Sequence, residues 1–233
     1  MEPAEHLNER FGWRRAPCAD ADVRLWLVDV GADPAALPAT TLALSQDEID
    51  RANRFIRPAD RARFMLTRAA LRHLLAEATG REARTLDFCA GPYGKPALVG
   101  DDLQFNASHS AALALIGISA RRPIGVDIEQ MRGAIDELRL AESFFRADEH
   151  GFLAGLAGGR RLEAFYRIWT AKEAVLKAFG FGITAYLKDF RVRLNPAGID
   201  IEPAPDCFKP ELAAVRAASV DAPAGYAAAY ALA

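Results

Sequence analysis

Hydrophobic and polar positions follow one another in patterns that predict strands and helices from the N-terminal part of the chain onward. Residues 23–30 alternate between apolar and polar side chains and include β-branched and aromatic types, which is typical of a half-buried strand. Ser45 and Glu48 have the spacing of a capping box and predict a short helix that continues to about Phe55. A strand followed by a helix is therefore expected here.

A longer helix is predicted over 59–79, where large apolar residues recur at helical spacing. Pro58 suits the first turn of this helix, and Gly80 suits the residue that ends it. After Thr85 the pattern changes to short strands separated by turn residues, with one apolar run typical of a central strand. These strands are predicted at residues 85–90, 103–108, 111–119 and 124–129.

The second part of the chain repeats this order of elements. Helices are predicted at 137–157 and 161–179, and strand-like alternation returns at 189–194, 198–203 and 225–233. The sequence thus predicts an α+β fold of two similar, pseudosymmetric halves packed together, with the active site in the cleft between them. We expect an N-terminal extension at 1–22, a first half at 23–122 and a second half at 123–233.

Composition and charge narrow the class of protein. The 233 residues are 51% hydrophobic and 26% charged, which is the balance of a globular chain with a substantial core. The net charge of −2 argues against a nucleic-acid or membrane binder, although residues 51–72 hold seven arginines and one aspartate, a local charge of +6. Three widely spaced cysteines and the lack of any apolar run near ~18 residues favour a cytoplasmic protein without disulfides.

Two carboxylates belong to the strand predicted at 124–129. Asp127 and Glu129 are two positions apart, so both side chains point to one face of the strand, roughly 7 Å apart. Ile128 and its apolar neighbours then take the opposite face. Such a pair is costly unless water solvates it or a hard cation such as Mg²⁺ bridges it. Both an exposed polar face and a metal site fit this pattern.

The helix predicted at 161–179 carries a second charged group, formed by Lys172, Glu173 and Lys177. Glu173 and Lys177 are four residues apart and share a face, which a surface ion pair would also explain. Trp169 lies one turn before Glu173 and favours a less solvated carboxylate. A glutamate with two lysines near a carboxylate pair is the composition that holds a metal and a polyphosphate together.

Two other segments offer polar groups. In the segment FNASHS, Ser108 and His109 are adjacent, and adjacent side chains point to opposite sides of an extended backbone. The sequence has no GxSxG elbow, so a covalent serine mechanism is not expected. Short hydroxyls and a histidine can bind phosphate, and a plain polar turn is the alternative. The turn GPYGKP adds Lys95.

Four motifs, taken in order, resemble one protein family. They are Gly94-Lys95-Pro96, then FNASHS at 105–110, then GVDIE at 125–129, and then WTAKEA at 169–174 with Lys177. From about residue 47 to 190 the chain resembles the two-halved, Sfp-type group of the 4′-phosphopantetheinyl transferase superfamily. The last two motifs at their spacing are the specific ones.

The resemblance implies an enzyme, a holo-[carrier protein] synthase, that transfers the 4′-phosphopantetheine group of coenzyme A to a serine and releases adenosine 3′,5′-bisphosphate. The serine belongs to an apo acyl carrier protein or to a peptidyl or aryl carrier domain, and a monomer is expected. By similarity, Asp127, Glu129 and Glu173 hold Mg²⁺, for which Mn²⁺ can substitute. The residues assigned to catalysis are Glu173, Lys177 and Asp127, with either Glu173 or a metal-bound water deprotonating the serine.

The same resemblance implies contacts with the phosphates and nucleotide of coenzyme A by Arg51, Arg63, Lys95, Ser108, His109, Lys172 and Lys177. Arg54, Arg57 and Arg68 are alternatives to the two arginines in this set. Two other functions stay open. One is a different Mg²⁺-dependent phosphate-transferring enzyme, which would act without a carrier protein, and the other is a non-catalytic module that binds coenzyme A or a carrier protein.

Overall fold

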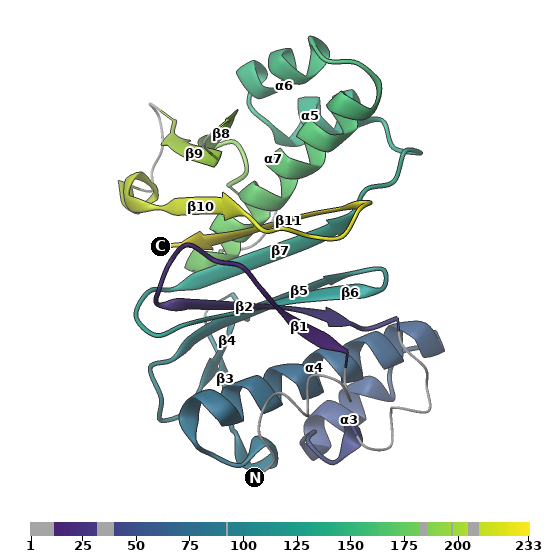
Figure 1. The fold of residues 1–233 in the computed structure, drawn as a ribbon, viewed down its shortest axis with the longest axis vertical. Coiled ribbons are helices and arrows are strands. Elements are labelled where there is room, and N and C mark those ends of the chain that lie inside the picture. The colour runs from purple at the N-terminus through teal and green to yellow at the C-terminus, as the bar shows by residue number, and fades with distance from the viewer. Residues whose placement is uncertain (1–11, 32–39, 92, 182–185, 197, 205–209) are drawn as a thin grey trace.

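The fold is that of a computed structural model, which describes residues 12–31, 40–91, 93–181, 186–196, 198–204 and 210–233. Two antiparallel sheets lie one above the other, each with helices on its outer side (Figure 1). The predicted α+β class with two sheet-bearing halves is confirmed. Within the described ranges, no helix combines the length and the apolar character needed to cross a membrane.

The first half is built on a sheet with the strand order β1-β2-β6-β5. Helices α3 (Gln46–Ala52) and α4 (Pro58–Thr79) belong to this half. The predicted capping box of α3 is present, and Gly80 ends α4 in a left-handed conformation. A 3₁₀ turn, η2, follows at Ala83–Thr85. The strands, including the separate β3–β4 hairpin, are β1 (Trp13–Ala16), β2 (Val23–Asp29), β3 (Phe88–Ala90), β4 (Pro96–Leu98), β5 (Gln104–Ser110) and β6 (Leu113–Ser119).

The second half is built on a sheet with the strand order β7-β11-β10-β9-β8. Its strands are β7 (Ile124–Gln130), β8 (Phe190–Asn195), β9 (Gly198–Pro203), β10 (Arg216–Ser219) and β11 (Tyr226–Leu232). Helices α5 (Glu137–Phe144), α6 (Ala147–Ala154) and α7 (Gly158–Phe179) cover one face of this sheet, and a 3₁₀ turn, η3, lies at Pro210–Ala214 (Figure 1).

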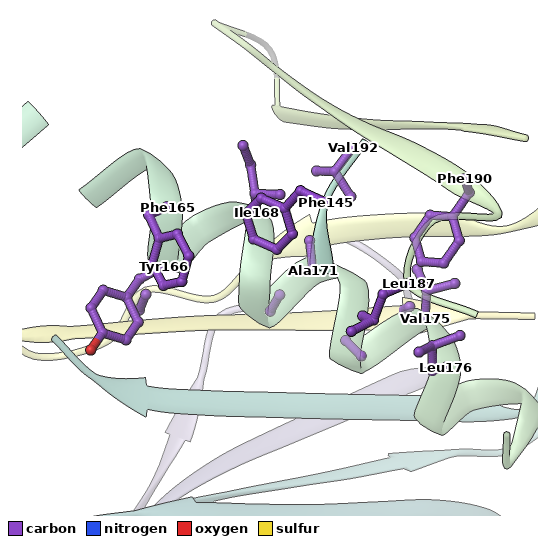
Figure 2. Packing of buried hydrophobic residues seen from close by; sticks show 14 of the residues in the cluster. Phe145, Phe165, Tyr166, Ile168, Ala171, Val175, Leu176, Leu187, Phe190 and Val192 are labelled. Atoms are coloured by element: carbon purple, nitrogen blue, oxygen red, sulfur yellow. The ribbon is translucent and has the colours of Figure 1, made fainter. Parts of the chain in front are cut away.

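The core of the second half forms along the apolar stripe of α7 (Figure 2). Ile168 and Val175 are fully buried there, and Phe190 from β8 closes the same cluster. Phe145 stacks on Phe165 with ring centroids 5.4 Å apart. Each buried side chain of this size contributes roughly 1.5–3 kcal/mol. This packing fixes the orientation of α7 and therefore of the charged residues on its other faces.

A second core joins the two halves. Leu25 and Leu115 from the first sheet pack in one cluster with Val126, Ile128 and Tyr230 from the second. All five side chains are buried. Because this core contains both sheets, β5 and β7, which are the edge strands that face each other, are held in a fixed relation.

The sequence pattern misplaces some elements. The predicted helix over 137–157 is two helices, because Phe145 adopts an extended conformation and turns its ring into the core at 2% exposed. Strands β1, β4 and β10 are not predicted, because three or four residues are too few for a period-two pattern to be recognised. The backbone of β1 pairs with residues Leu25 to Val28 of β2, so this strand is stabilised by hydrogen bonds to its partner and not by a local sequence pattern.

Candidate functional site

Asp127 and Glu129 project from one face of β7, and apolar residues occupy the other face. Ile124, Val126 and Ile128 are fully buried in the core shared by both sheets. Asp127 is 1% exposed, and Glu129 is partly buried. The predicted alternation along this strand is confirmed, and the acidic face is the one against which α7 packs.

Glu173 and Lys177 lie one turn apart on α7 and reach the acidic face of β7. Lys177 Nζ is 2.5 Å from Asp127 Oδ1 and 3.0 Å from Glu173 Oε2. Helix and strand approach closely because Gly125 has no side chain. A Cβ at Gly125 would lie 2.0 Å from the carbonyl oxygen of Ala174 in α7. The close approach gathers one acid from the strand and one from the helix around a single ammonium group.

Strand β5 supplies hydroxyl groups to the same cluster. Ser108 Oγ donates to Asp127 Oδ1 at 2.8 Å, and Ser110 Oγ donates to Glu129 Oε2 at 2.7 Å. The backbone N–H of Val126 donates to Asn106 Oδ1 at 2.9 Å. Alternate side chains of β5 therefore join the edges of the two sheets. These hydroxyls hold the carboxylates of β7 in place, which is a role additional to the phosphate contact expected of Ser108.

The side chain of His109 points away from this seam, as expected for a neighbour of Ser108 on an extended strand. His109 remains exposed. Partial burial lowers the pKa of His109, and the positive charges of Arg63 and Lys177 lower it further. Arg63 and Lys177 therefore give the imidazole a positively charged environment.

Burial and repulsion raise the pKa of two carboxyl groups in the cluster. Burial raises the pKa of Glu173, and the negative charge of Asp127 adds to the rise, while Lys177 opposes it. Burial also raises the pKa of Glu129, against the hydrogen bond from Ser110. Burial alone would lower the pKa of Lys177, but Asp127 and Glu173 raise it above its ordinary value. Lys177 pairs with two of the three carboxyl groups, so negative charge exceeds positive charge within the cluster.

The cluster has the donor chemistry of a site for a hard cation. Asp127 Oδ2 is buried and has no hydrogen-bond partner among the described residues, which is a costly state for a carboxylate oxygen. Mg²⁺ prefers oxygen ligands of this kind. In the described part of the chain, no three His, Cys, Asp or Glu side chains are gathered closely enough to form a metal cage. Lys177 Nζ lies between Asp127 and Glu173 instead.

Lys172 does not join the cluster, and its assignment as a ligand contact is corrected. Its side chain is 0% exposed, and Nζ is 3.0 Å from Glu149 Oε2. The ammonium group also donates to the backbone oxygens of Leu187 and Phe190, at 2.8 and 2.7 Å. Adjacent residues on a helix point about 100° apart, so Lys172 faces the core of the second half when Glu173 faces β7. This lysine is therefore structural.

Lys95 connects the two halves by its side chain. Its Nζ donates to the backbone oxygen of Ile124 at 3.0 Å and to that of Ala178 at 2.7 Å. Burial lowers the pKa of Lys95 to about 8. These bonds place Lys95 at the start of β7 and the end of α7. The ammonium group is therefore hydrogen-bonded to the backbone and does not project toward a ligand.

Two members of the arginine-rich segment are structural. Arg68 and Arg72 bind the carboxylate of Glu48, at 2.5 and 2.6 Å. Arg72 is 2% exposed and also donates to two backbone oxygens. Arg68, named above as an alternative contact for coenzyme A, is therefore bound to a carboxylate of its own chain. Glu48 precedes the 51–72 window, and helix packing brings it onto α4.

Arg51 and Arg63 lie elsewhere on the first half. The guanidinium group of Arg51 lies 5.2 Å from the ring centroid of Phe64 and is exposed. Arg63 Nε donates to the backbone oxygen of Ala111 at 2.7 Å, in the turn between β5 and β6. Arg63 also pairs with Asp60. Arg63 thus stands beside the strand that carries Ser108 and His109.

Sequence reasoning assigned no role to Gly125, Ser110 or Glu149. The first two belong to the quoted motifs, and their spacing gave a signal. Ser110 is two residues from Ser108, and Gly125 is two residues from Asp127, so each lies on the same face of its strand as that neighbour. Glu149 gave no such signal. An acidic residue at the start of a helix is common, and only packing shows that it pairs with Lys172.

Comparisons with known proteins identify the family. Residues 123–231 match the model of the 4′-phosphopantetheinyl transferase superfamily. The chain is 39% identical to the 4′-phosphopantetheinyl transferase HetI of Nostoc sp. over 180 residues, which cover 75% of each protein. It is 32% identical to a 4′-phosphopantetheinyl transferase of Bacillus subtilis over 72% of this chain and 74% of that one. For Sfp of Bacillus subtilis strain 168, the identity is 29% over 72% and 74%. The chain therefore belongs to the 4′-phosphopantetheinyl transferase superfamily.

Proposed function

We propose that this enzyme transfers the 4′-phosphopantetheine group of coenzyme A to a serine hydroxyl of an apo carrier protein, and that the transfer requires Mg²⁺. The observation that supports this most directly is the buried cluster at the seam of the two sheets. It combines three carboxylates with Lys177, and among the described residues Asp127 Oδ2 has no hydrogen-bond partner. Phosphoryl transfer needs such a combination, because metal and lysine together neutralise a pyrophosphate.

Asp127, Glu129 and Glu173 would hold the metal ion, which would supply positive charge to the pyrophosphate of coenzyme A. The two hydrogen bonds from Ser108 and Ser110 keep Asp127 and Glu129 oriented before any ligand arrives. Pre-orientation of this kind lowers the cost of ordering the site during the reaction.

The remaining groups of the chain act on the substrate. Lys177 neutralises charge on the pyrophosphate of coenzyme A. His109, with Arg51 and Arg63, binds the 3′-phosphate. Glu173 accepts the proton of the carrier serine, for which a raised pKa is suitable. The serine oxygen then forms a bond to the phosphorus that carries the pantetheine, and the bond from that phosphorus to adenosine 3′,5′-bisphosphate breaks.

The test is mass spectrometry of an apo peptidyl carrier domain incubated with coenzyme A, Mg²⁺ and the enzyme. The carrier should gain the pantetheine group, and chelation of Mg²⁺ should stop the gain. Asp127→Asn should slow loading by at least about 10²-fold, because it removes a charge from the site. Asp102→Asn is the matched control, since Asp102 is exposed outside the cluster. Loading by Asp127→Asn at the wild-type rate would contradict the metal assignment.

The same experiment separates the two other functions. A non-catalytic module would bind coenzyme A or the carrier without any change in carrier mass. A different phosphate-transferring enzyme would consume coenzyme A or a nucleotide when no carrier is present.

A further inference from the structure

The connection between α3 and α4 exposes two large apolar side chains next to each other. Ile56 is 97% exposed and Phe55 is 37% exposed. Apolar surface of this kind is costly in water, and neighbouring apolar residues within a polar rim often mark a protein contact. Phe55 packs on Phe64 with ring centroids 5.4 Å apart, so the exposed pair has rigid support from α4.

Three arginines lie close to this apolar pair along the chain. Arg54, Arg57 and Arg61 are all exposed, and none of them forms an ion pair with the described acidic residues. This distinguishes them from Arg68 and Arg72 further along α4, which are bound to Glu48. We call Arg54, Phe55, Ile56, Arg57 and Arg61 the α3–α4 corner. Its charge is available for a partner with carboxylates.

The α3–α4 corner lies beside the candidate site. Arg63, two residues after Arg61, donates to the backbone oxygen of Ala111 at 2.7 Å. Ala111 is in the turn that follows β5, where the hydroxyls of Ser108 and Ser110 hold the acidic cluster. The first turn of α4 and the β5–β6 turn lie at the same side of the molecule (Figure 1).

Two other exposed apolar residues, Tyr93 and Phe152, lack this combination. Tyr93 is 60% exposed but packs edge-on against Phe181. Phe152, 48% exposed, is on α6 in the second half, where the neighbouring residues of the helix include the acidic Asp148 and Glu149. Among the described residues, the α3–α4 corner therefore pairs apolar exposure with unpaired positive charge.

We infer that the α3–α4 corner docks the carrier protein, through a surface segment of the carrier in which an apolar side chain is flanked by carboxylates. This inference rests on the proposed function, because the serine that is modified belongs to a separate protein that must contact the rim of the site. Ile56 provides the apolar anchor, and the arginines orient the acidic flanks. The corner contributes to carrier binding and takes no part in the transfer step.

The test measures the KM for carrier and the KM for coenzyme A separately, with an apo peptidyl carrier domain as the probe. Ile56→Ser should raise the KM for carrier about tenfold, which is the effect of losing an interface anchor. The triple variant Arg54→Gln, Arg57→Gln, Arg61→Gln should raise the same KM and abolish its dependence on salt. In Ile56→Ser, the KM for coenzyme A and kcat should stay within twofold of wild type.

The matched control is Phe152→Ser combined with Arg160→Gln, which removes an exposed apolar residue and an exposed arginine from the second half. This control should leave the KM for carrier unchanged. All variants should keep the wild-type unfolding temperature, because the altered side chains are at the surface.

Two outcomes would overturn the inference. An unchanged KM for carrier in Ile56→Ser and in the triple variant would remove the docking role. A rise in the KM for coenzyme A alone would show that the arginines bind its phosphates. Failure of the wild-type enzyme to load any carrier would instead contradict the proposed function, so the two failures are distinguishable.

Discussion

Gly125→Ala tests the central geometric claim, that the site depends on the close contact between α7 and β7. The added Cβ would lie 2.0 Å from Ala174 O, 2.3 Å from Ala178 N and 2.8 Å from Lys177 C. Ordinary contact begins at 3.4 Å, and all three obstructing atoms are helix backbone, so no side chain can rotate away. Helix and strand must separate by about 1.4 Å to accommodate the methyl group.

A separation of this size opens the candidate site. If the separation acts along the line from Lys177 Nζ to Asp127 Oδ1, the distance between these atoms increases from 2.5 Å to about 3.9 Å. That distance is too long for a hydrogen bond. A displacement of about 1 Å in a catalytic group costs on the order of 10²-fold in rate. Overpacking should lower the free energy of unfolding by about 1–3 kcal/mol. Replacing a glycine by alanine also reduces the entropy of the unfolded chain, but this stabilises the protein by only roughly 0.4–1 kcal/mol, so the net effect is destabilising.

The assays are the rate of carrier loading and the free energy of unfolding in urea. Gly151→Ala in α6 is the matched control, because a Cβ there meets no atom within 4 Å. It should raise stability by about 0.5–1 kcal/mol and leave the loading rate unchanged. If Gly125→Ala loads carrier at the wild-type rate and unfolds at the wild-type urea concentration, the reasoning about the helix–strand contact is refuted.

Two further predictions concern Lys172 and Lys95. Lys172→Met should lower the free energy of unfolding, measured in urea, by about 3–5 kcal/mol, because Glu149 stays buried without its ion partner. The double variant Lys172→Met, Glu149→Gln should recover part of this loss. Equal stability of the single and the double variant would contradict this explanation. The pKa of Lys95 falls from 10.5 to about 8 on folding, so the unfolded chain binds more protons between these values. The stability of wild type relative to Lys95→Met should therefore rise from pH 8 to 10.5 in urea titrations, and a parallel pH dependence would contradict it.

Local patterns predicted most of the elements and some of the side-chain arrangement within them. The alternation at 124–129 correctly placed Asp127 and Glu129 on one face, and helical spacing correctly placed Glu173 and Lys177 one turn apart. These relations involve residues within one turn or one pleat, where backbone geometry alone sets the direction of a side chain. The break between α5 and α6 was not predictable in this way, because it depends on the burial of Phe145 against Phe165.

The sequence by itself thus determined the α+β order of elements, the four motifs and the residue types available for phosphate and metal chemistry. The tertiary structure alone decided which of those residues meet. Ser108 contacts Asp127 because the edges of the two sheets share a core. Lys172 points away from the site and pairs with Glu149 of another helix. Glu48 binds two of the arginines. Contacts between segments distant along the chain depend on how the elements pack, and local periodicity carries no information about that packing.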